Sequence, residues 1–97
     1  MINKDDNYYI KLVLKGNIEA FSWLVETHQD HVFNLAFRIS GNREEAEEIA
    51  QDAFMKAFRS LKGFRMKSSF STWLYRITYN TSISYVRSRK KGILYLE

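Results

Sequence analysis

The chain contains no proline, and its four glycines stand at widely spaced positions, 16, 41, 63 and 92. Proline and glycine are the residues that most often interrupt regular structure, so the segments between these glycines can wind as helices without a break. Most of these segments are too long to be typical strands. The spacing therefore predicts an all-α fold, a compact bundle of about four helices.

Periodicity and capping residues indicate where each helix begins and ends. Apolar residues recur at three- and four-residue steps, as on the buried face of an amphipathic helix. We expect helices over about 6–15, 17–40, 42–63 and 70–91. The predicted caps are Asp5 or Asp6, Asn17, Asn42 with Glu45 in a capping box, and Ser68 or Ser69, with Gly41 ending the second helix.

Charge is divided unevenly along the chain. Of the 97 residues, 1–58 carry ten acids and six bases, whereas 59–97 carry nine bases and one acid. The net charge is therefore −4 in the first part and +8 in the second. A field of one sign attracts partners of the opposite charge, so the C-terminal part is suited to a polyanion and the N-terminal part to a different partner.

Composition narrows the class of protein. A hydrophobic fraction of 45% with 27% charged residues is typical of one globular domain. The absence of cysteine excludes a disulfide framework and a thiolate metal site. The sequence shows neither a signal-peptide pattern nor an apolar run that could cross a bilayer, so we expect a cytoplasmic protein.

The third predicted helix has two different faces. Its apolar arc consists of Ala46, Ile49, Ala50, Ala53, Phe54, Ala57 and Leu61, and its opposite side of Glu44, Glu48, Gln51, Asp52 and Met55. Phe58 borders this second side. Charged faces are common on solvated helices. Exposed apolar residues beside acids of one sign instead favour a docking surface for a basic partner.

The fourth predicted helix combines packing residues with a polar stripe. The packing face is predicted to be Phe70, Trp73, Leu74, Ile77, Thr81 and Ser84, and the stripe is Thr72, Arg76, Asn80, Ile83 and Arg87, followed by Arg89, Lys90 and Lys91. Arginine pairs with phosphates or guanine edges and asparagine with base edges, so the stripe predicts nucleic-acid binding. A basic helix end that suits the helix dipole explains the last residues but not Asn80.

Aromatic residues crowd the same region. Phe70, Trp73, Tyr75 and Tyr79 fall close together, and rings spread around a helix leave some at the surface, where they invite stacking or partner contact. The basic loop 62–69 has Phe64 at its centre. That ring either packs into the core or covers an unstacked base, and the sequence leaves both interpretations open.

The residues argue against an enzyme and a metal site, but they leave two other kinds of binding module open. No cysteine nucleophile, glycine-rich phosphate loop or Ser/His/Asp constellation indicates an enzyme. His28 and His31 flank Asp30 without a third or fourth metal ligand, so we predict neither a metal nor a cofactor. Two alternatives remain open, a helical repressor module that binds duplex DNA and a protein-interaction bundle with an incidental basic tail.

Two segments, AEEIAQDAFMKAFRSL and GFRMKSSFSTWLYRITYNTSISYVRSRKK, strongly resemble region 2 of bacterial sigma factors of the extracytoplasmic-function (ECF) type. The resemblance covers nearly the whole chain and keeps the order and spacing of the acidic helix, the loop and the aromatic helix of that family. It implies a transcription-initiation subunit that recruits core RNA polymerase, helps to open the minus-ten promoter element and reads its non-template strand.

The resemblance also implies roles for particular residues. The surface for the clamp helices of the polymerase β′ subunit would comprise Glu47, Glu48, Ile49, Gln51, Asp52 and Phe54, beside Met55 and Phe58. The loop around Phe64 would cage a base flipped out of the duplex, and Asn80 would contact that base. The same pocket would be lined or supported by Arg65, Ser69, Trp73, Arg76 and Ile77.

Departures from the family limit what can be carried over. Met66, Lys67 and Ser84 stand where other residue types are frequent, so the promoter preference cannot be copied from a relative. The family has a second domain that reads the minus-thirty-five element and is absent from this sequence. We expect residues 1–91 to form the region 2 domain and 92–97 to begin a linker, in an excised domain or a natural short form. Anti-sigma factors bind this domain in relatives, which makes one a candidate partner.

Overall fold

The computed structural model describes residues 3–96 of the chain, and side chains over 3–89. The helices are α1 (Asp6–Leu14), α2 (Phe21–Ser40), α3 (Arg43–Ser60) and α4 (Phe70–Leu96), with two short 3₁₀ turns, η1 (Ile18–Ala20) and η2 (Leu61–Gly63). No described residue lies in a strand. The prediction of an all-α bundle of about four helices is confirmed.

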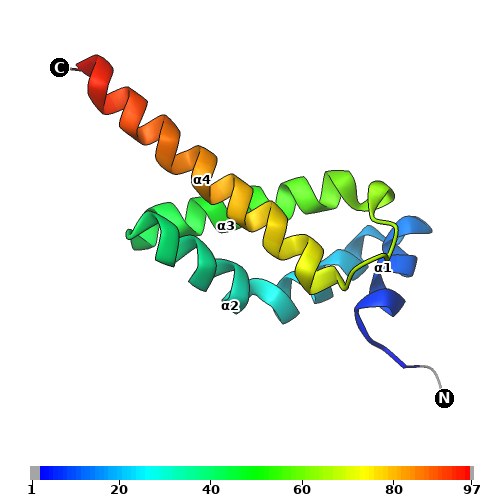
Figure 1. Ribbon diagram of the computed structural model, residues 1–97. Helices are drawn as coiled ribbons and strands as arrows, with labels where there is room; N and C mark the ends of the chain where they lie inside the picture. The colour runs from blue at the N-terminus through cyan, green and yellow to red at the C-terminus, as the bar shows by residue number, and fades with distance from the viewer. Residues whose placement is uncertain (1–2, 97) are drawn as a thin grey trace.

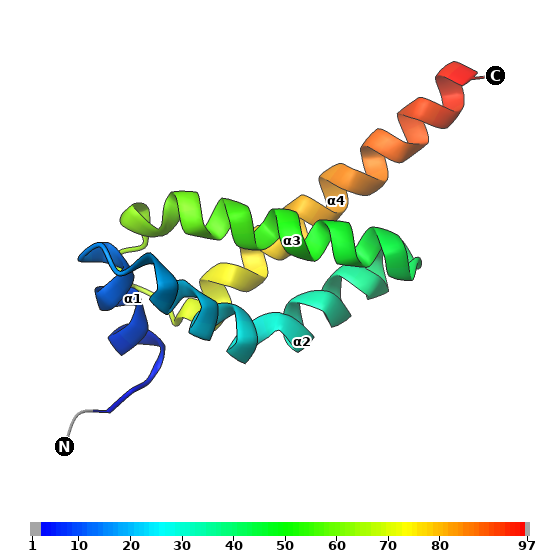
Figure 2. The same cartoon turned by 180° about the vertical axis from the view of Figure 1, so that it is seen from behind.

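Three long helices form the body of the bundle and α1 closes one end of it. α2, α3 and α4 pack against one another in pairs, whereas α1 lies against η1 and α2 (Figure 1). The view from behind shows α3 in front of α4, whose C-terminal turns project beyond the other helices (Figure 2). This projection gives the molecule its elongated dimensions of 60 × 23 × 22 Å.

Four of the predicted helix boundaries are made by the residues expected. The side chains of Asp5, Asn42 and Ser69 each accept a hydrogen bond from the backbone N–H three residues later, at 3.1, 3.0 and 3.1 Å. Such caps satisfy N–H groups that have no partner within the helix. Gly41 ends α2 in the left-handed conformation, with φ 72°, which glycine adopts without steric cost.

Three boundary details differ from the prediction. Asn17 makes no side-chain cap, because the chain first winds as the 3₁₀ turn η1 before α2 begins at Phe21. The side chain of Glu45 does not close a capping box but pairs with Arg89 on α4. Finally, α4 does not end near Lys91 but continues to Leu96. Gly92 is thus tolerated inside the helix, at a cost of roughly 1 kcal/mol relative to alanine.

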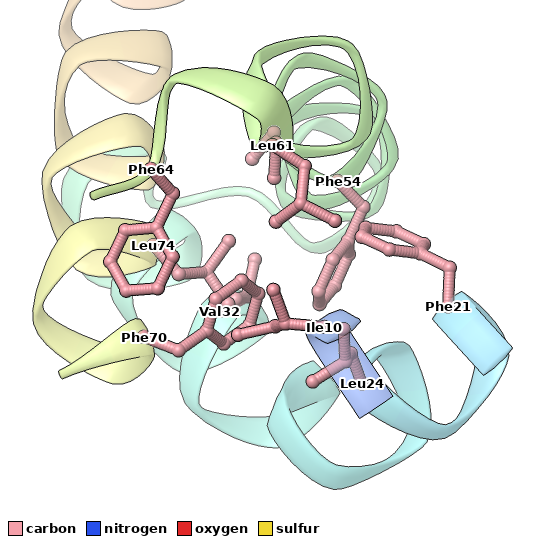
Figure 3. Close-up of a cluster of buried hydrophobic side chains, with 11 residues drawn as sticks. Ile10, Phe21, Leu24, Val32, Phe54, Leu61, Phe64, Phe70 and Leu74 are labelled. Carbon is pink, nitrogen blue, oxygen red and sulfur yellow. The ribbon is translucent and has the colours of Figure 1, made fainter. Parts of the chain in front are cut away.

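The main core gathers side chains from all four helices and from the loop before α4 (Figure 3). Its buried members are Ile10, Phe21, Leu24, Val32, Ala53, Phe54, Ala57, Leu61, Phe64, Phe70 and Leu74. A second, smaller cluster of Ala36, Ala46 and Ile49 joins α2 to α3. Each large side chain in these clusters stabilises the fold by roughly 1.5 to 3 kcal/mol through its removal from water.

The buried face of α4 is more polar than predicted. Thr78 and Ser82 are fully buried, whereas Ser84, which was expected to pack, is exposed. The hydroxyls of Thr78 and Ser82 donate to the backbone carbonyls four residues earlier, at 2.8 and 2.7 Å. Because these hydrogen bonds satisfy the hydroxyls within the helix itself, the two small side chains can be buried without a partner on another helix.

The two histidines of α2 have different surroundings. His28 is 6% exposed, and its Nε2 donates to the carboxylate of Asp6, 2.9 Å from Oδ1, which ties α1 to α2. Its ring meets Phe70 edge-on, with 5.2 Å between centroids. His31 is exposed. His28 therefore has a structural contact, and no group of three or more potential metal-ligating side chains occurs within the described part of the chain.

Candidate nucleic-acid and protein interfaces

A polar stripe runs along the outer face of α4, as the sequence predicted. The side chains of Thr72, Arg76, Asn80 and Arg87 are exposed, and Ile83 among them is half-buried. Residues spaced three and four apart share one face of a helix, so these side chains form a continuous row. An amide between two guanidinium groups can contact base edges and phosphates of one nucleic-acid strand.

Phe64 lies in the core rather than at the surface of the loop before α4. The ring is 7% exposed and packs on Trp73 and Phe70, with centroid separations of 5.0 and 6.0 Å. Figure 3 shows Phe64 beside Phe70 in the core. The sequence left open whether this ring packs into the core or covers a base, and in the structure it packs into the core. In this conformation the ring does not offer its face to a base, so a direct contact with DNA would require Phe64 to leave the core. Burial of Phe64 instead anchors the loop to α4.

The loop residues after Phe64 face solvent. Arg65, Met66 and Lys67 are exposed, and Met66 has a φ of 58°, the left-handed conformation that costs a non-glycine residue roughly 1 to 2 kcal/mol. Ser69 is exposed, and its hydroxyl both caps α4 and donates to Oγ1 of Thr72 at 2.9 Å. The loop thus presents two basic side chains beside the start of the stripe.

The remaining predicted nucleic-acid residues differ in accessibility. Trp73 and Ile77 are half-buried and pack against the main core. Arg89 contacts the Glu45 carboxylate and, at 3.4 Å, the carbonyl of Ser40, so its guanidinium is already engaged by protein. Lys90 and Lys91 lie in the part of α4 whose side chains the structure does not describe.

The acidic face of α3 is exposed, with one correction to its predicted membership. Glu44, Glu47, Glu48, Gln51 and Asp52 are exposed, together with Met55 at 53% and Phe58 at 38%. Ile49 has no exposed surface, and Phe54 is only 8% exposed because it points into the main core. A partner docking on this face cannot reach the side chain of Ile49, so we remove Ile49 from the predicted surface. Phe54 lines a hollow together with Met55 and Phe58, so it stays a predicted contact through the edge of its ring.

An apolar hollow adjoins the acidic face and includes a residue that was not predicted. Ile18 is 63% exposed and lines this hollow together with Met55 and Phe58, between η1, α2 and α3. Exposed apolar side chains beside charged ones are typical of protein interfaces. Ile18 was missed because it precedes the periodic stripe of α2, and only folding brings it beside α3.

Polar contacts join the acidic face of α3 to α4. The Tyr85 hydroxyl donates to Oε2 of Glu48 at 2.8 Å, and Arg89 pairs with Glu45. Nearer the middle of α4, Nζ of Lys56 lies 3.4 Å from Oγ1 of Thr81. The two candidate surfaces are thus held in a fixed relation by contacts that the sequence pattern gave no reason to expect.

The Tyr85–Glu48 contact has a measurable pH dependence. The hydrogen bond to the Glu48 carboxylate raises the pKa of Tyr85 above its ordinary value of 10.0. A raised pKa favours the protonated phenol in the folded state, so the contact stabilises the protein below pH 10.0 and this contribution is lost as the pH rises through the raised value. We expect the difference in unfolding free energy between wild type and Tyr85→Phe to stay constant near neutral pH and to shrink above pH 10.0, measured by urea unfolding.

The Glu48→Gln background provides the control, because without the carboxylate the effect of Tyr85→Phe should no longer vary with pH in this way. A difference that is unchanged on both sides of pH 10.0 in the natural background would show that the hydrogen bond does not form in solution.

Two exposed rings on α4 were not assigned to any site. Tyr75 is 53% and Tyr79 is 46% exposed. The crowding of rings in this segment predicted that some would reach the surface, and these two are the ones that do. Both lie beside the polar stripe, and each lines a shallow hollow that also includes Arg76 and Asn80.

Comparisons with known proteins agree on one family. Residues 24–92 match the family model described as Sigma-70 region 2. The chain is 43% identical over 81 residues to the ECF RNA polymerase sigma factor SigW of Bacillus subtilis, an alignment that covers 84% of this chain and 43% of that protein. It is 37% identical over 89 residues to the RNA polymerase sigma-H factor of Pseudomonas aeruginosa, covering 92% and 46%.

A solved structure shares the fold. It is described as the NMR structure of the complex formed by an engineered region 2 of sigmaE in complex with GTAAAA. The TM-score is 0.86 at 33% sequence identity, and the match covers 94% of this chain and 97% of that one. The chain spans less than half the length of the two sigma factors it matches, 43% and 46%, but nearly all of this isolated region.

Proposed function

Because the chain belongs to the Sigma-70 region 2 family, in the form found in ECF sigma factors, we propose that it links core RNA polymerase to promoter DNA in transcription initiation. One observation carries the proposal. An exposed acidic face on α3 and an exposed stripe of arginine and asparagine on α4 lie on helices that pack against each other. Two faces of such different chemistry suit two partners, one basic and one polyanionic.

In this proposal the acidic face of α3 docks on the clamp helices of the polymerase β′ subunit. Glu48 and Asp52 would attract basic side chains, with Glu47 and Gln51 beside them, and Met55 and Phe58 would supply apolar contact. Exposed apolar side chains contribute affinity, whereas the acids contribute orientation and the rate of encounter. The hollow that includes Ile18 extends the apolar part of this surface.

The stripe on α4 would read the melted non-template strand of the minus-ten element. Asn80 would contact a base edge, while Arg76 and Arg87 hold phosphates and Arg65 and Lys67 approach from the loop. Extruding a base costs a few kcal/mol, which contacts to its edge and face must offset. The similarity to a sigmaE region 2 in complex with GTAAAA supports this role.

The proposed role is non-catalytic and would be exercised with RNA polymerase in the cytoplasm, without a cofactor. The described helices include none with the length and apolar character needed to cross a membrane. An anti-sigma factor is a further candidate partner, which would cover the same surfaces and compete with polymerase.

A pair of titrations separates the proposal from its alternatives. The domain is titrated with core RNA polymerase, and with a fluorescent minus-ten strand in single-stranded and duplex form at several salt concentrations. The proposed function predicts binding to polymerase and to the single strand. A repressor-like module would bind duplex more tightly and ignore polymerase, and an interaction bundle would show no salt-dependent DNA binding at all.

The Asn80→Ala variant tests base reading directly. Its affinity for the single strand is expected to fall by about 1 to 3 kcal/mol, since a bidentate contact to a base edge is lost. Affinity for polymerase and helicity should stay at wild-type values because the side chain is exposed. Asn34→Ala on α2, also at an exposed asparagine, is the matched control for fluorescence anisotropy. Equal affinities of the two variants would remove Asn80 from the reading site.

A further inference from the structure

Tyr75 and Tyr79 present aromatic surface that nothing described in the structure covers. At 53% and 46% exposure they are among the most exposed rings of the described chain, and neither ring packs against another aromatic side chain within residues 3–89. They are four residues apart on α4, so both rings lie on one face of the helix. Large rings side by side at a surface usually mark a contact site.

The two rings border the polar stripe on the side away from the loop. At the helical step of about 100° per residue, Tyr75 and Tyr79 lie on one flank of Arg76, and Trp73 and Asn80 lie on the other. Shallow hollows join Tyr75 to Thr72 and Arg76, and Tyr79 to Arg76 and Asn80. A nucleotide chain held at Arg76 can therefore place bases on either flank of α4.

A smaller and more enclosed hollow of about 210 Å³ continues from Tyr75 to α2. Val32, Leu35 and Leu74 give it an apolar floor, and its rim includes Tyr75, Ser71 and the exposed His31. The volume is below the roughly 300 to 1,000 Å³ of pockets for drug-sized ligands, so the hollow suits a single flat ring system. An imidazole and hydroxyls on the rim can hydrogen-bond the edge of such a ring.

The charge around these rings favours a nucleic-acid strand over an acidic or neutral partner. The guanidinium of Arg76 lies between the two tyrosines in sequence and shares a hollow with each of them. No acidic residue lines any of the three hollows that include Tyr75. Rings that alternate with a cation are typical of surfaces on which successive bases stack while the backbone is held by charge.

We propose that Tyr75 and Tyr79 form a second base-stacking site for single-stranded DNA, and that the hollow between α2 and α4 receives one unpaired base. This inference rests on the proposed function and extends it from the loop side of α4 to the α2 side. The site takes bases outside a duplex, because only an unstacked base offers its face to a side chain. It adds affinity through ring contact and no phosphate charge.

The test uses a set of labelled minus-ten strands, each with one base replaced by an abasic unit, titrated by fluorescence anisotropy. For wild type, at least one abasic position outside the base contacted by Asn80 is expected to weaken binding about 5- to 150-fold. Tyr75→Ala should weaken binding to the intact strand by a similar factor and should no longer respond to that abasic position. Tyr75→Phe, which keeps the ring, should bind within about twofold of wild type, and Tyr79→Ala should behave like Tyr75→Ala at a neighbouring position.

Two controls separate stacking from charge and from general loss of aromatic surface. The dependence of log affinity on log salt should be unchanged in Tyr75→Ala and flatter in Arg76→Ala, because only arginine releases counterions. Phe37→Ala removes a ring that is 43% exposed on α2 and should leave strand binding unchanged.

The outcomes distinguish the inference from the function on which it rests. If wild type binds the strand and Asn80→Ala weakens it, while both tyrosine-to-alanine variants bind like wild type, the second site is refuted and the proposed function stands. If the alanine variants weaken binding but respond to every abasic position as wild type does, the rings do not stack on a base. If the tyrosine-to-alanine variants lower the affinity for polymerase and not for the strand, the face with Tyr75 and Tyr79 contacts protein and the stacking site is refuted. Failure of wild type to bind the strand at all would refute both.

Discussion

Replacing Glu48 and Asp52 together by lysine is expected to weaken binding to core RNA polymerase by about 2 to 5 kcal/mol, or at least about 30-fold. Both side chains are exposed on the same face of α3, so the variant turns two attractive charges toward the partner into repulsive ones. Like charges placed opposite each other cost several kcal/mol at an interface. The affinity for a minus-ten single strand should not fall, because the change lies on another helix and makes the protein more basic.

The variant also removes contacts within the domain, and these need their own controls. Asp52 pairs with Lys56 at 3.3 Å, but the exposed pair contributes little to stability. Glu48 accepts the hydrogen bond from Tyr85, so Tyr85→Phe reports the effect of losing that contact alone. Glu26→Lys makes the same kind of charge change at an exposed position of α2. The proposed docking surface is wrong if Glu26→Lys weakens polymerase binding as much as the double variant, with all proteins shown to be helical by circular dichroism.

Replacing Phe64 by alanine is expected to lower the free energy of unfolding by about 3 to 5 kcal/mol. The ring is buried and contacts Trp73 and Phe70, so its removal leaves a cavity at the junction between the loop and α4. Domains of this size have total stabilities of roughly 5 to 15 kcal/mol, which makes this a large fraction. Urea unfolding followed by circular dichroism measures the change, and Phe37→Ala, at a half-exposed ring, should cost far less.

This expectation changes how DNA binding by Phe64 variants should be interpreted. Loss of strand affinity in Phe64→Ala would reflect a displaced loop as well as any lost contact with a base. Phe64→Leu keeps apolar volume and removes the ring, so it separates the two effects. A stable Phe64→Leu protein that fails to bind the strand would indicate that the ring leaves the core to meet a base. Wild-type stability in Phe64→Ala would contradict the packing described above.

Local features of the sequence predicted the helices well. A cap depends on residues within one turn of each other, which is why Asp5, Asn42, Ser69 and Gly41 could be assigned before folding was considered. The prediction that the side chain of Asn17 caps a helix was wrong. A residue type that favours caps is also compatible with the start of a 3₁₀ turn, and periodicity does not distinguish a 3₁₀ turn from an α-helix in so short a segment. The third helix was divided correctly into core and exposed faces, since its apolar residues follow one clear arc.

Contacts between distant segments were less predictable. Whether Phe64 is buried depends on Phe70 and Trp73 closing over it, which no pattern within the loop reveals. Thr78 and Ser82 were left out of the packing face because it was centred on Ile77, Thr81 and Ser84, whereas the buried face is turned toward Leu74 and Thr78. Hydroxyls bonded to their own helix are easily buried there. The pairing of α4 with Glu45 and Glu48 joins residues far apart in sequence and changes which charges remain free on each surface.

For the candidate site too, features set by local helical spacing could be predicted, whereas burial and exposure set by distant contacts could not. The stripe on α4 could be predicted because helical spacing alone places its members in a row. Ile49 was assigned to a contact surface from the family resemblance, while its own periodicity placed it in the core, and burial agrees with the periodicity. Tyr75 and Tyr79 carried a signal, the excess of rings in one segment, but only their exposure distinguished them from Phe70, which packs.

The uninterrupted winding of α4 fixes a length. Asn80 and Arg87 are separated by about two helical turns, roughly 10 Å along the axis at about 1.5 Å per residue. In the proposed function, the distance between a base read at Asn80 and a phosphate held at Arg87 is thus set by a rigid rod rather than by a loop. In the proposed function, a one-residue insertion between the two positions would therefore turn Arg87 by about 100° away from the strand read at Asn80.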